Sequence, residues 1–222
     1  MKKTFLVIFC LTGLSLFAQT NAAQVAPGAR EQLDTLLNNP AMVQPAGITP
    51  QGRHWFRLET DAHVITNEAG FGQVAGVLDD WENTSKIFHG KISRLQEKII
   101  SRDGDDTIID FTMISFAPLG IQIKTPYRTA VRTVEKSESK IHVEMRQLAS
   151  DSASNKDIKN LFAVRYAEKI TIAGTPYTYI RIYAIDDVNT SILPGARGIL
   201  EKNAAPSNIE ALQLIIAAAK AR

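Results

Sequence analysis

Cysteine is almost missing from this sequence: the only one is Cys10, inside an apolar run near the N-terminus. If that run is removed, the remaining chain has no thiol, which excludes disulfide bonds, thiolate nucleophiles and cysteine-ligated metals. An excess of either charge is missing too, since 25 Lys and Arg side chains stand against 23 Asp and Glu side chains. Losing Lys2 and Lys3 with the run would leave the two signs equal. A balanced charge argues against nucleic acid as a partner, because phosphate recognition depends on an excess of Lys and Arg.

Sequence motifs for catalysis and for metal binding are also missing. The histidines are scattered, and none has a second histidine or a carboxylate at ligand spacing on one predicted face. They are His54, His63, His89 and His142. The glycines of Gly70-Phe71-Gly72 lack the spacing of a phosphate-binding loop. We therefore predict no metal, no cofactor and no catalytic residues.

Residues 1–23 have the layout of a secretory signal peptide. Lys2 and Lys3 precede an apolar run from Phe5 to Phe17, which is followed by small residues up to Ala23. The run is shorter than the about 20 apolar residues that a membrane-spanning helix needs. We therefore expect cleavage after Ala22 or Ala23, a periplasmic or secreted protein, and no integral membrane segment after cleavage.

Residues 24–52 are predicted to form a short helix and a linker. The helix would run from Ala29 to Asn38 and stop before Pro40, because proline disfavours helical geometry in the residue before it. The segment from Pro40 to Gly52 holds three prolines and two glycines, a composition typical of an extended tether. We place the domain boundary there, with one domain over residues 53–222.

The domain begins with a strand and two short helices. Apolar and polar residues alternate from His54 to Val64, which predicts a half-buried strand. Apolar spacing then predicts one short helix from Phe71 and a second one from Asp79 or Asp80 to Phe88. Another strand, Ile92 to Ser101, leads into a hairpin turn with an Asp-Gly signature.

From Asp106 to Ile185 the sequence predicts an antiparallel meander of five strands with a turn signal at each reversal. A polar insert, Ser150 to Asn160, is expected to be a loop. Ser207 and Glu210 have the spacing of a capping box, which predicts a helix from Ser207 to Ala221. The predicted fold class is α+β, with a curved antiparallel sheet of six to seven strands, two short helices after strand one, and a C-terminal helix packed on the concave face.

The segment Val74 to Phe88, VAGVLDDWENTSKIF, resembles a pattern of the START-like or polyketide-cyclase-like superfamily (SRPBCC), which has the helix-grip fold. In that pattern an apolar short helix ends in Asp, and an aromatic residue and a second helix follow. The resemblance covers about His54 to Ala221. It implies an apolar cavity between the sheet and the terminal helix, which in relatives holds lipids, sterols, polyketides or other apolar small molecules.

Seven residues are candidates for contact with a ligand in such a cavity. Their apolar and aromatic side chains suit adaptable apolar contact, although each could equally fill a solid core. Five come from strand positions expected to face inward, and two lie where relatives form the mouth of the pocket or where helices are anchored to the sheet. They are Phe111, Met113, Tyr127, Met145 and Tyr166, and then Trp81 and Phe88.

We interpret the sequence as that of an exported, monomeric, non-enzymatic protein that binds a hydrophobic small molecule or lipid. Two alternatives stay open. One is a cyclase-like or hydrolase-like enzyme that uses a carboxylate such as Asp79 or Asp110 in the cavity, and the other is a structural or interaction module with a filled core. Arg181 lies among tyrosines and could hold an anionic head group, but cross-strand pairing on an outer sheet face is the simpler interpretation.

Overall fold

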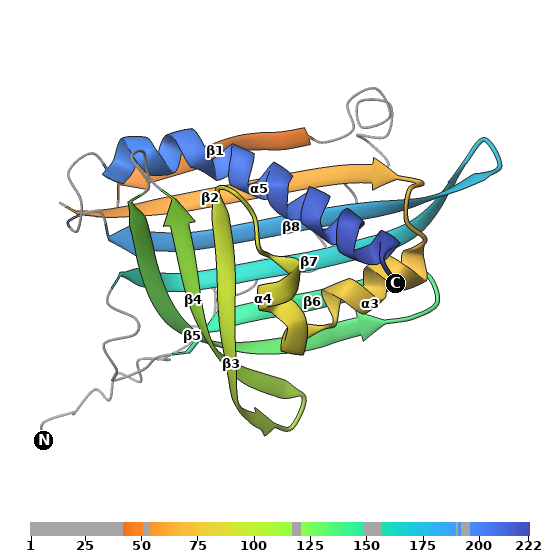
Figure 1. Ribbon diagram of the computed structural model, residues 1–222, viewed down its shortest axis with the longest axis horizontal. Helices are drawn as coiled ribbons and strands as arrows, with labels where there is room; N and C mark the ends of the chain where they lie inside the picture. The colour runs from red at the N-terminus through yellow and green to blue at the C-terminus, as the bar shows by residue number, and fades with distance from the viewer. Residues whose placement is uncertain (1–41, 51–53, 117–120, 149–156, 190, 192–195) are drawn as a thin grey trace, which may run out of the picture. The chain divides into compact units, whose positions relative to one another are not determined.

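The alternating segments of the sequence form the strands of one antiparallel sheet in the computed structural model (Figure 1). The structure describes residues 42–50, 54–116, 121–148, 157–189, 191 and 196–222. The strands lie side by side in the order β1-β2-β8-β7-β6-β5-β4-β3. Their bounds are β1 Met42–Pro50, β2 Trp55–Thr66, β3 Ser93–Asp103, β4 Asp106–Phe116, β5 Gln122–Lys136, β6 Lys140–Gln147, β7 Ile158–Ile172 and β8 Thr175–Asn189.

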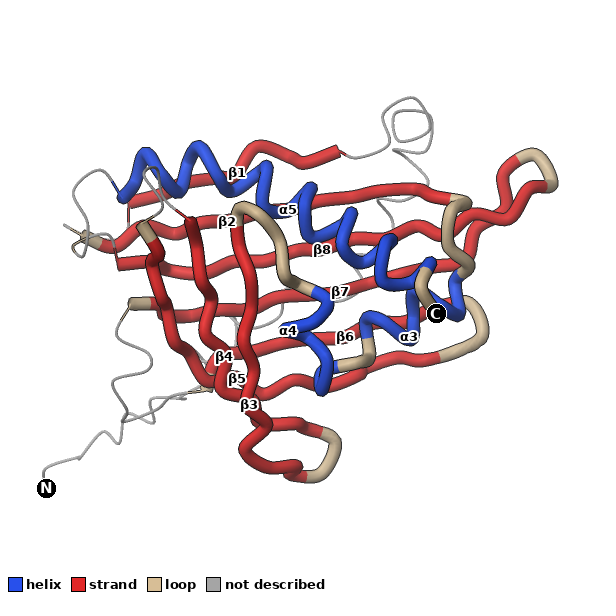
Figure 2. The backbone as a smooth tube through the Cα atoms, viewed as in Figure 1, coloured by secondary structure: helices blue, strands red, loops and turns tan. Residues whose placement is uncertain are grey.

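The predicted meander is confirmed, because each strand from β4 to β8 pairs with the next one in the chain. After β8 the sheet continues through β2, whose residues Trp55 to Thr66 pair with Asn189 to Thr178. The sheet is strongly curved, so that β3 and β4 cross in front of the other strands (Figure 2). The predicted helix-grip fold class is confirmed, with one strand more than the six to seven expected.

The additional strand corrects the linker prediction for Met42–Pro50. β1 pairs antiparallel with β2, from Met42 opposite His63 to Pro50 opposite Phe56, with an irregularity between Gln44 and Gly47. Prolines are tolerated in a strand at an edge or at a bulge, and β1 offers both. The predicted signal peptide and the helix at Ala29 to Asn38 lie outside the described residues.

Short helices follow β2, as the apolar spacing predicted. They are α3 Phe71–Leu78, the 3-10 helix η2 Trp81–Asn83 and α4 Thr84–Ile87. The second predicted helix is therefore divided in two. Val74, Val77 and Leu78 of α3 are buried, and α3 packs against β6, β7 and the C-terminal helix α5.

The C-terminal helix α5, Ala196–Lys220, begins eleven residues before the predicted start at Ser207. Gly198, Asn203 and Pro206 are poor helix formers and hide the helical signal in the first part of α5. Tertiary packing outweighs this weak propensity, since α5 packs on the sheet and Ala204 in its first part is buried. Ser207 is therefore inside the helix and not at its N-cap, so the predicted capping box is wrong.

The buried face of α5 covers part of the inner face of the sheet. The helix crosses β1, β2 and β8 (Figure 1), and Leu212, Ile215 and Ala219 are almost completely buried. A helix that buries such side chains against a sheet stabilises the fold through the hydrophobic effect, at about 1.5 to 3 kcal/mol for each large apolar side chain. None of the described helices is both long enough and apolar enough to span a membrane.

Candidate functional site

A cavity lies between the inner face of the sheet and α5. Its volume is about 300 Å³, at the lower end of the range of small-molecule sites in proteins. Its walls are mainly aliphatic, aromatic and methionine side chains from β2 to β8 and from α5. Examples are Leu58, Ile123, Met145, Ile182, Ile199 and Leu214.

Four of the seven predicted ligand-contacting residues line this cavity, namely Phe88, Met113, Tyr127 and Met145. Phe111 is buried next to them and stacks on Tyr127, with 5.7 Å between ring centres. Trp81 packs edge-on against Phe111 with 6.4 Å between ring centres, which anchors η2 to the sheet. That these residues contact a ligand stays a prediction.

Tyr166 is the exception, because it lies on the opposite face of the sheet. Its hydroxyl group donates a hydrogen bond of 2.8 Å to Glu168, and its ring is edge-on to those of His142 and Tyr179. In β7 the positions of Ala163 and Arg165 face the cavity. The expectation that Tyr166 faces inward is wrong, because apolar side chains are buried on both faces of this strand and the alternation alone does not fix its phase.

Five charged residues among the described ones line the cavity, and none of them was chosen from the sequence as a site residue; they are Arg94, Arg165, Asp157, Asp186 and Glu210. Arg165 on β7 follows Leu161 and Ala163 in the inward phase, and Asp186 on β8 follows Ala184 in the same way. The sequence does carry a signal for both residues: every second residue of each strand faces inward, and those that line the cavity are apolar except for the one charged side chain. Such a position is informative because burying a charge costs free energy, so a buried charge is often functional.

The apolar cavity changes the protonation equilibria of these side chains. Burial, together with the nearby charge of Asp187, raises the pKa of Asp186 to about 7. Burial lowers the pKa of Arg165 to about 10, which still leaves its guanidinium protonated at neutral pH. Burial also raises the pKa of the Tyr127 hydroxyl above its ordinary value. Among the charged groups that line the cavity, Arg165 is therefore a cation at neutral pH, and Asp186 is a carboxyl group that titrates near neutrality.

The two acids proposed from sequence for an enzyme lie elsewhere. Asp79 accepts hydrogen bonds from Lys136 and Thr133, each 2.6 Å long. Asp110 forms a two-pronged ion pair with Arg128, with the Nε–Oδ1 distance at 2.6 Å. Neither carboxylate lines the cavity between the sheet and α5. The carboxyl groups that do so are those of Asp157, Asp186 and Glu210.

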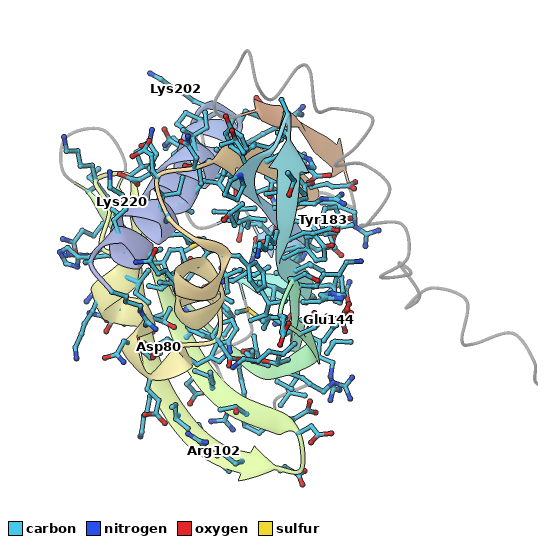
Figure 3. The ribbon with its side chains drawn as sticks, turned by 90° about the vertical axis from the view of Figure 1, so that its right-hand side faces the viewer. Asp80, Arg102, Glu144, Tyr183, Lys202 and Lys220 are labelled. Atoms are coloured by element: carbon cyan, nitrogen blue, oxygen red, sulfur yellow. The ribbon has the colours of Figure 1, made fainter. Side chains whose placement is uncertain are left out.

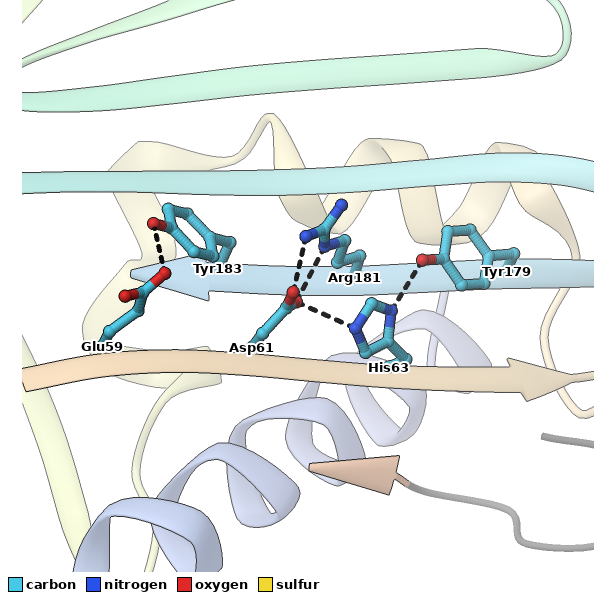
Figure 4. Close-up of polar contacts among 6 residues, drawn as sticks. All are labelled: Glu59, Asp61, His63, Tyr179, Arg181 and Tyr183. Atoms are coloured by element: carbon cyan, nitrogen blue, oxygen red, sulfur yellow. Dashed lines mark hydrogen bonds and ion pairs between the residues drawn. The ribbon is translucent and has the colours of Figure 1, made fainter. Parts of the chain in front are cut away.

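The outer face of β2 and β8 carries a polar network (Figure 4). Arg181 donates to Asp61 with an Nε–Oδ1 distance of 2.7 Å, and the Tyr183 hydroxyl donates to Glu59 at 2.9 Å. In the side view, Tyr183 and Glu144 lie on the side of the sheet away from α5, which carries Lys202 and Lys220 (Figure 3). Arg181 is thus paired across strands on the outer face, and the simpler of the two interpretations offered for it fits the structure.

Glu210 of α5 fastens the helix to the rim of the cavity. Its carboxylate accepts backbone hydrogen bonds from Lys91 at 2.6 Å and from Ile92 at 3.0 Å. A Cβ atom at Gly90 would overlap this carboxylate, so a larger residue there would displace the Glu210 side chain. Glu210 was predicted to cap its own helix. Instead, it accepts hydrogen bonds from backbone N–H groups of the segment that leads into β3.

This architecture was compared with those of known proteins. No model of a known protein family matches the chain, and no curated protein sequence matches it significantly. Solved structures do match. The human StAR-related lipid transfer protein 5 has a TM-score of 0.53 at 10% identity, covering 90% of this chain and 96% of its own.

Two further solved structures have the same degree of similarity. Human STARD10 has a TM-score of 0.51 at 10% identity, over 79% of this chain and 73% of its own. The TTHA0849 protein of Thermus thermophilus has a TM-score of 0.51 at 13% identity, over 73% of this chain and 97% of its own. At such low identity these similarities concern the fold alone. The chain has the helix-grip fold that the sequence predicted, and it shares this fold with these solved structures.

Proposed function

We propose that this protein is an exported, monomeric binding protein that holds a hydrophobic small molecule or lipid between the sheet and α5. The observation that carries the proposal is the apolar cavity of about 300 Å³ under the terminal helix. The structural neighbours that include a lipid transfer protein support the same class of ligand. A purely structural module, the third possibility, would have no use for an open apolar cavity of this kind.

The first test identifies the natural ligand. The protein should be purified from its own host without detergent, weighed by native mass spectrometry, and then extracted with organic solvent. We expect a bound mass that disappears on extraction and is recovered as an apolar molecule. The proposal fails if the purified protein carries no such mass and also binds no neutral hydrophobic dye.

A pair of variants on one strand tests whether the cavity is the binding site. Ala184 lines the cavity and Ile185 does not, because successive residues of a strand point to opposite faces of the sheet. Ala184→Phe should fill part of the cavity and weaken Nile red binding several-fold, whereas Ile185→Phe should leave it unchanged. Circular dichroism melting curves of both variants show whether they are folded. Equal Nile red binding by two folded variants would contradict the proposed site.

Export is tested separately. The layout of residues 1–23 supports cleavage near Ala23, so N-terminal sequencing of the mature protein should begin at Ala23 or Gln24. Recovery of an intact chain from Met1 in the membrane fraction would contradict this part of the proposal.

Asp186 supports a second candidate function, an enzyme that transfers a proton to or from an apolar substrate. A carboxyl group with a pKa near 7 is suited to general acid–base catalysis at neutral pH. A screen of polyketide-like and ester substrates with the wild type and with Asp186→Asn tests this possibility. Turnover that is lost in Asp186→Asn would support the enzyme, and turnover that persists in it would exclude this role for Asp186.

A further inference from the structure

Arg165 occupies a specific place in the cavity wall. It belongs to β7 and pairs with Ile182 of β8, in the middle of the sheet. Its guanidinium carbon lies 4.4 Å from the centre of the Trp81 ring and 4.5 Å from the centre of the Phe88 ring. Contact with two aromatic rings holds the guanidinium in position and contributes favourable cation–π interactions.

This arginine differs from several other arginines of the sheet in its partners. Arg57, Arg128 and Arg181 each make a two-pronged contact with an aspartate. Within the described part of the chain, Arg165 forms no hydrogen bond or ion pair with a carboxylate. The donors of Arg165 therefore remain available to whatever occupies the cavity that it lines.

Asp186 does not neutralise Arg165, although both line the cavity. No ion pair joins the two side chains among the described residues. A guanidinium in contact with the Asp186 carboxyl group would lower the pKa of that group, whereas the pKa is raised to about 7. Arg165 is thus a desolvated cation without a counter-ion among the described residues, which is costly until an anion or a strong acceptor arrives.

We propose that Arg165 binds the oxyanion head group of an amphiphilic ligand, a carboxylate or a phosphate monoester, whose apolar chain fills the rest of the cavity. The inference rests on the proposed function and names the chemical class of its ligand. The edge of a guanidinium offers parallel N–H donors that match two oxygens of such a group. A neutral sterol or alcohol offers a single hydroxyl oxygen, which cannot match the two parallel donors and leaves the charge unpaired.

The test uses three ligands with the same chain: dodecanoate, dodecyl phosphate and dodecanol. Binding to the full mature protein is measured at pH 8 by displacement of Nile red. We expect the wild type to bind at least one of the two anions about 10-fold to 100-fold more tightly than dodecanol, as expected for hydrogen bonds to a charged group. In Arg165→Gln this preference should disappear, with dodecanol binding unchanged.

Control variants separate recognition from charge and from folding. Arg102→Gln removes the same charge from an arginine that lies outside the cavity, and it should keep the preference. Arg165→Lys keeps the charge but loses the two-pronged geometry, so it should retain a reduced preference; it also replaces Arg165→Gln if the latter does not fold. Melting curves report folding of each variant.

Each outcome decides between the two proposals. Equal binding of the anions and dodecanol by the wild type, or a preference that survives in folded Arg165→Gln, overturns the role of Arg165 and leaves the hydrophobic binding function standing. Binding of Nile red without binding of any dodecyl ligand also overturns the role of Arg165. Failure to bind Nile red and all three ligands overturns the proposed function itself.

Discussion

At the scale of single residues, neighbours in sequence meet opposite environments. Asp186 and Asp187 follow each other on β8, and only Asp186 lines the cavity. Asp187 accepts hydrogen bonds from Arg57 at 2.9 Å and from Asn160 at 2.7 Å. Burial tends to raise the pKa of Asp187, but these hydrogen bonds bring it below its usual value. Two adjacent aspartates therefore have pKa values shifted in opposite directions.

We predict that Asp186→Asn stabilises the protein above neutral pH. Folding raises the pKa of Asp186 from 3.8 to about 7, so the folded state binds the proton more strongly than the unfolded state does. The contribution of Asp186 to stability therefore falls as the pH rises from about 4 to about 7. Asparagine does not titrate, so the variant should gain up to roughly 4 kcal/mol at pH 8. Urea unfolding between pH 4.5 and pH 8.5 measures this difference.

Asp187→Asn is the matched control, and its effect should have the opposite sign. The lowered pKa of Asp187 gives stability that is present above its unfolded pKa and lost as the pH falls through its folded pKa. Asp187→Asn should therefore destabilise the protein at pH 8. Stabilisation by both substitutions, or by neither, would mean that the two carboxyl groups do not differ in environment as described.

At the scale of elements, the edge strand β1 and the helix α5 pack against each other at one edge of the sheet. α5 packs against β1 as well as against β2 and β8, and β1 pairs along most of β2. Without β1, the backbone groups of β2 on that side would lose their partners and become a free sheet edge. β1 is therefore expected to be part of the folded unit and not a dispensable tether.

We predict that two truncations of the mature chain differ sharply in stability. A protein that starts at Ala41 keeps β1, and one that starts at Gln51 loses Met42–Pro50 with its hydrogen bonds to β2. The shorter protein should melt at a temperature at least several degrees lower, since about 1 kcal/mol corresponds to roughly 2–4 °C for a domain of about 150–250 residues. Melting curves followed by circular dichroism measure the difference. Equal melting temperatures would show that the pairing of β1 with β2 contributes little.

At the scale of the whole molecule, a cavity of about 300 Å³ in the middle of the domain links stability to ligand binding. A cavity without an occupant loses van der Waals contacts between its walls, which lowers stability. A ligand that binds the folded state alone restores those contacts and shifts the unfolding equilibrium by mass action.

We predict that removal of a co-purified ligand lowers the apparent stability and that adding it back restores it. At a ligand concentration of about 100 times Kd, the expected gain is roughly 2.7 kcal/mol. Differential scanning calorimetry of the extracted and the reloaded protein measures this gain. Ala184→Phe, which fills part of the cavity, should show a smaller gain; a gain of equal size would place the ligand elsewhere.

The sequence by itself determined the strands of the meander, the two-part helical segment after β2 and the presence of a terminal helix. These features rest on local signals: alternation with a period of two, apolar spacing of three to four, and an Asp-Gly turn, which Gly104 forms with a φ of 58°. For the same reason Met113, Tyr127 and Met145 were correctly placed on the inward faces of β4, β5 and β6.

Only the tertiary structure decided the remaining features. β1 is a strand because β2 offers it an edge, and the first part of α5 is helical because it packs over the sheet. Glu210 binds the segment before β3, at Lys91, 119 residues away in sequence. Which side chains of β7 face the cavity depends on what covers each face of the sheet. For this reason only the structure shows that Arg165 faces inward and that Tyr166 does not. Such long-range contacts leave no periodic trace in the chain, because their partners are brought together only by folding.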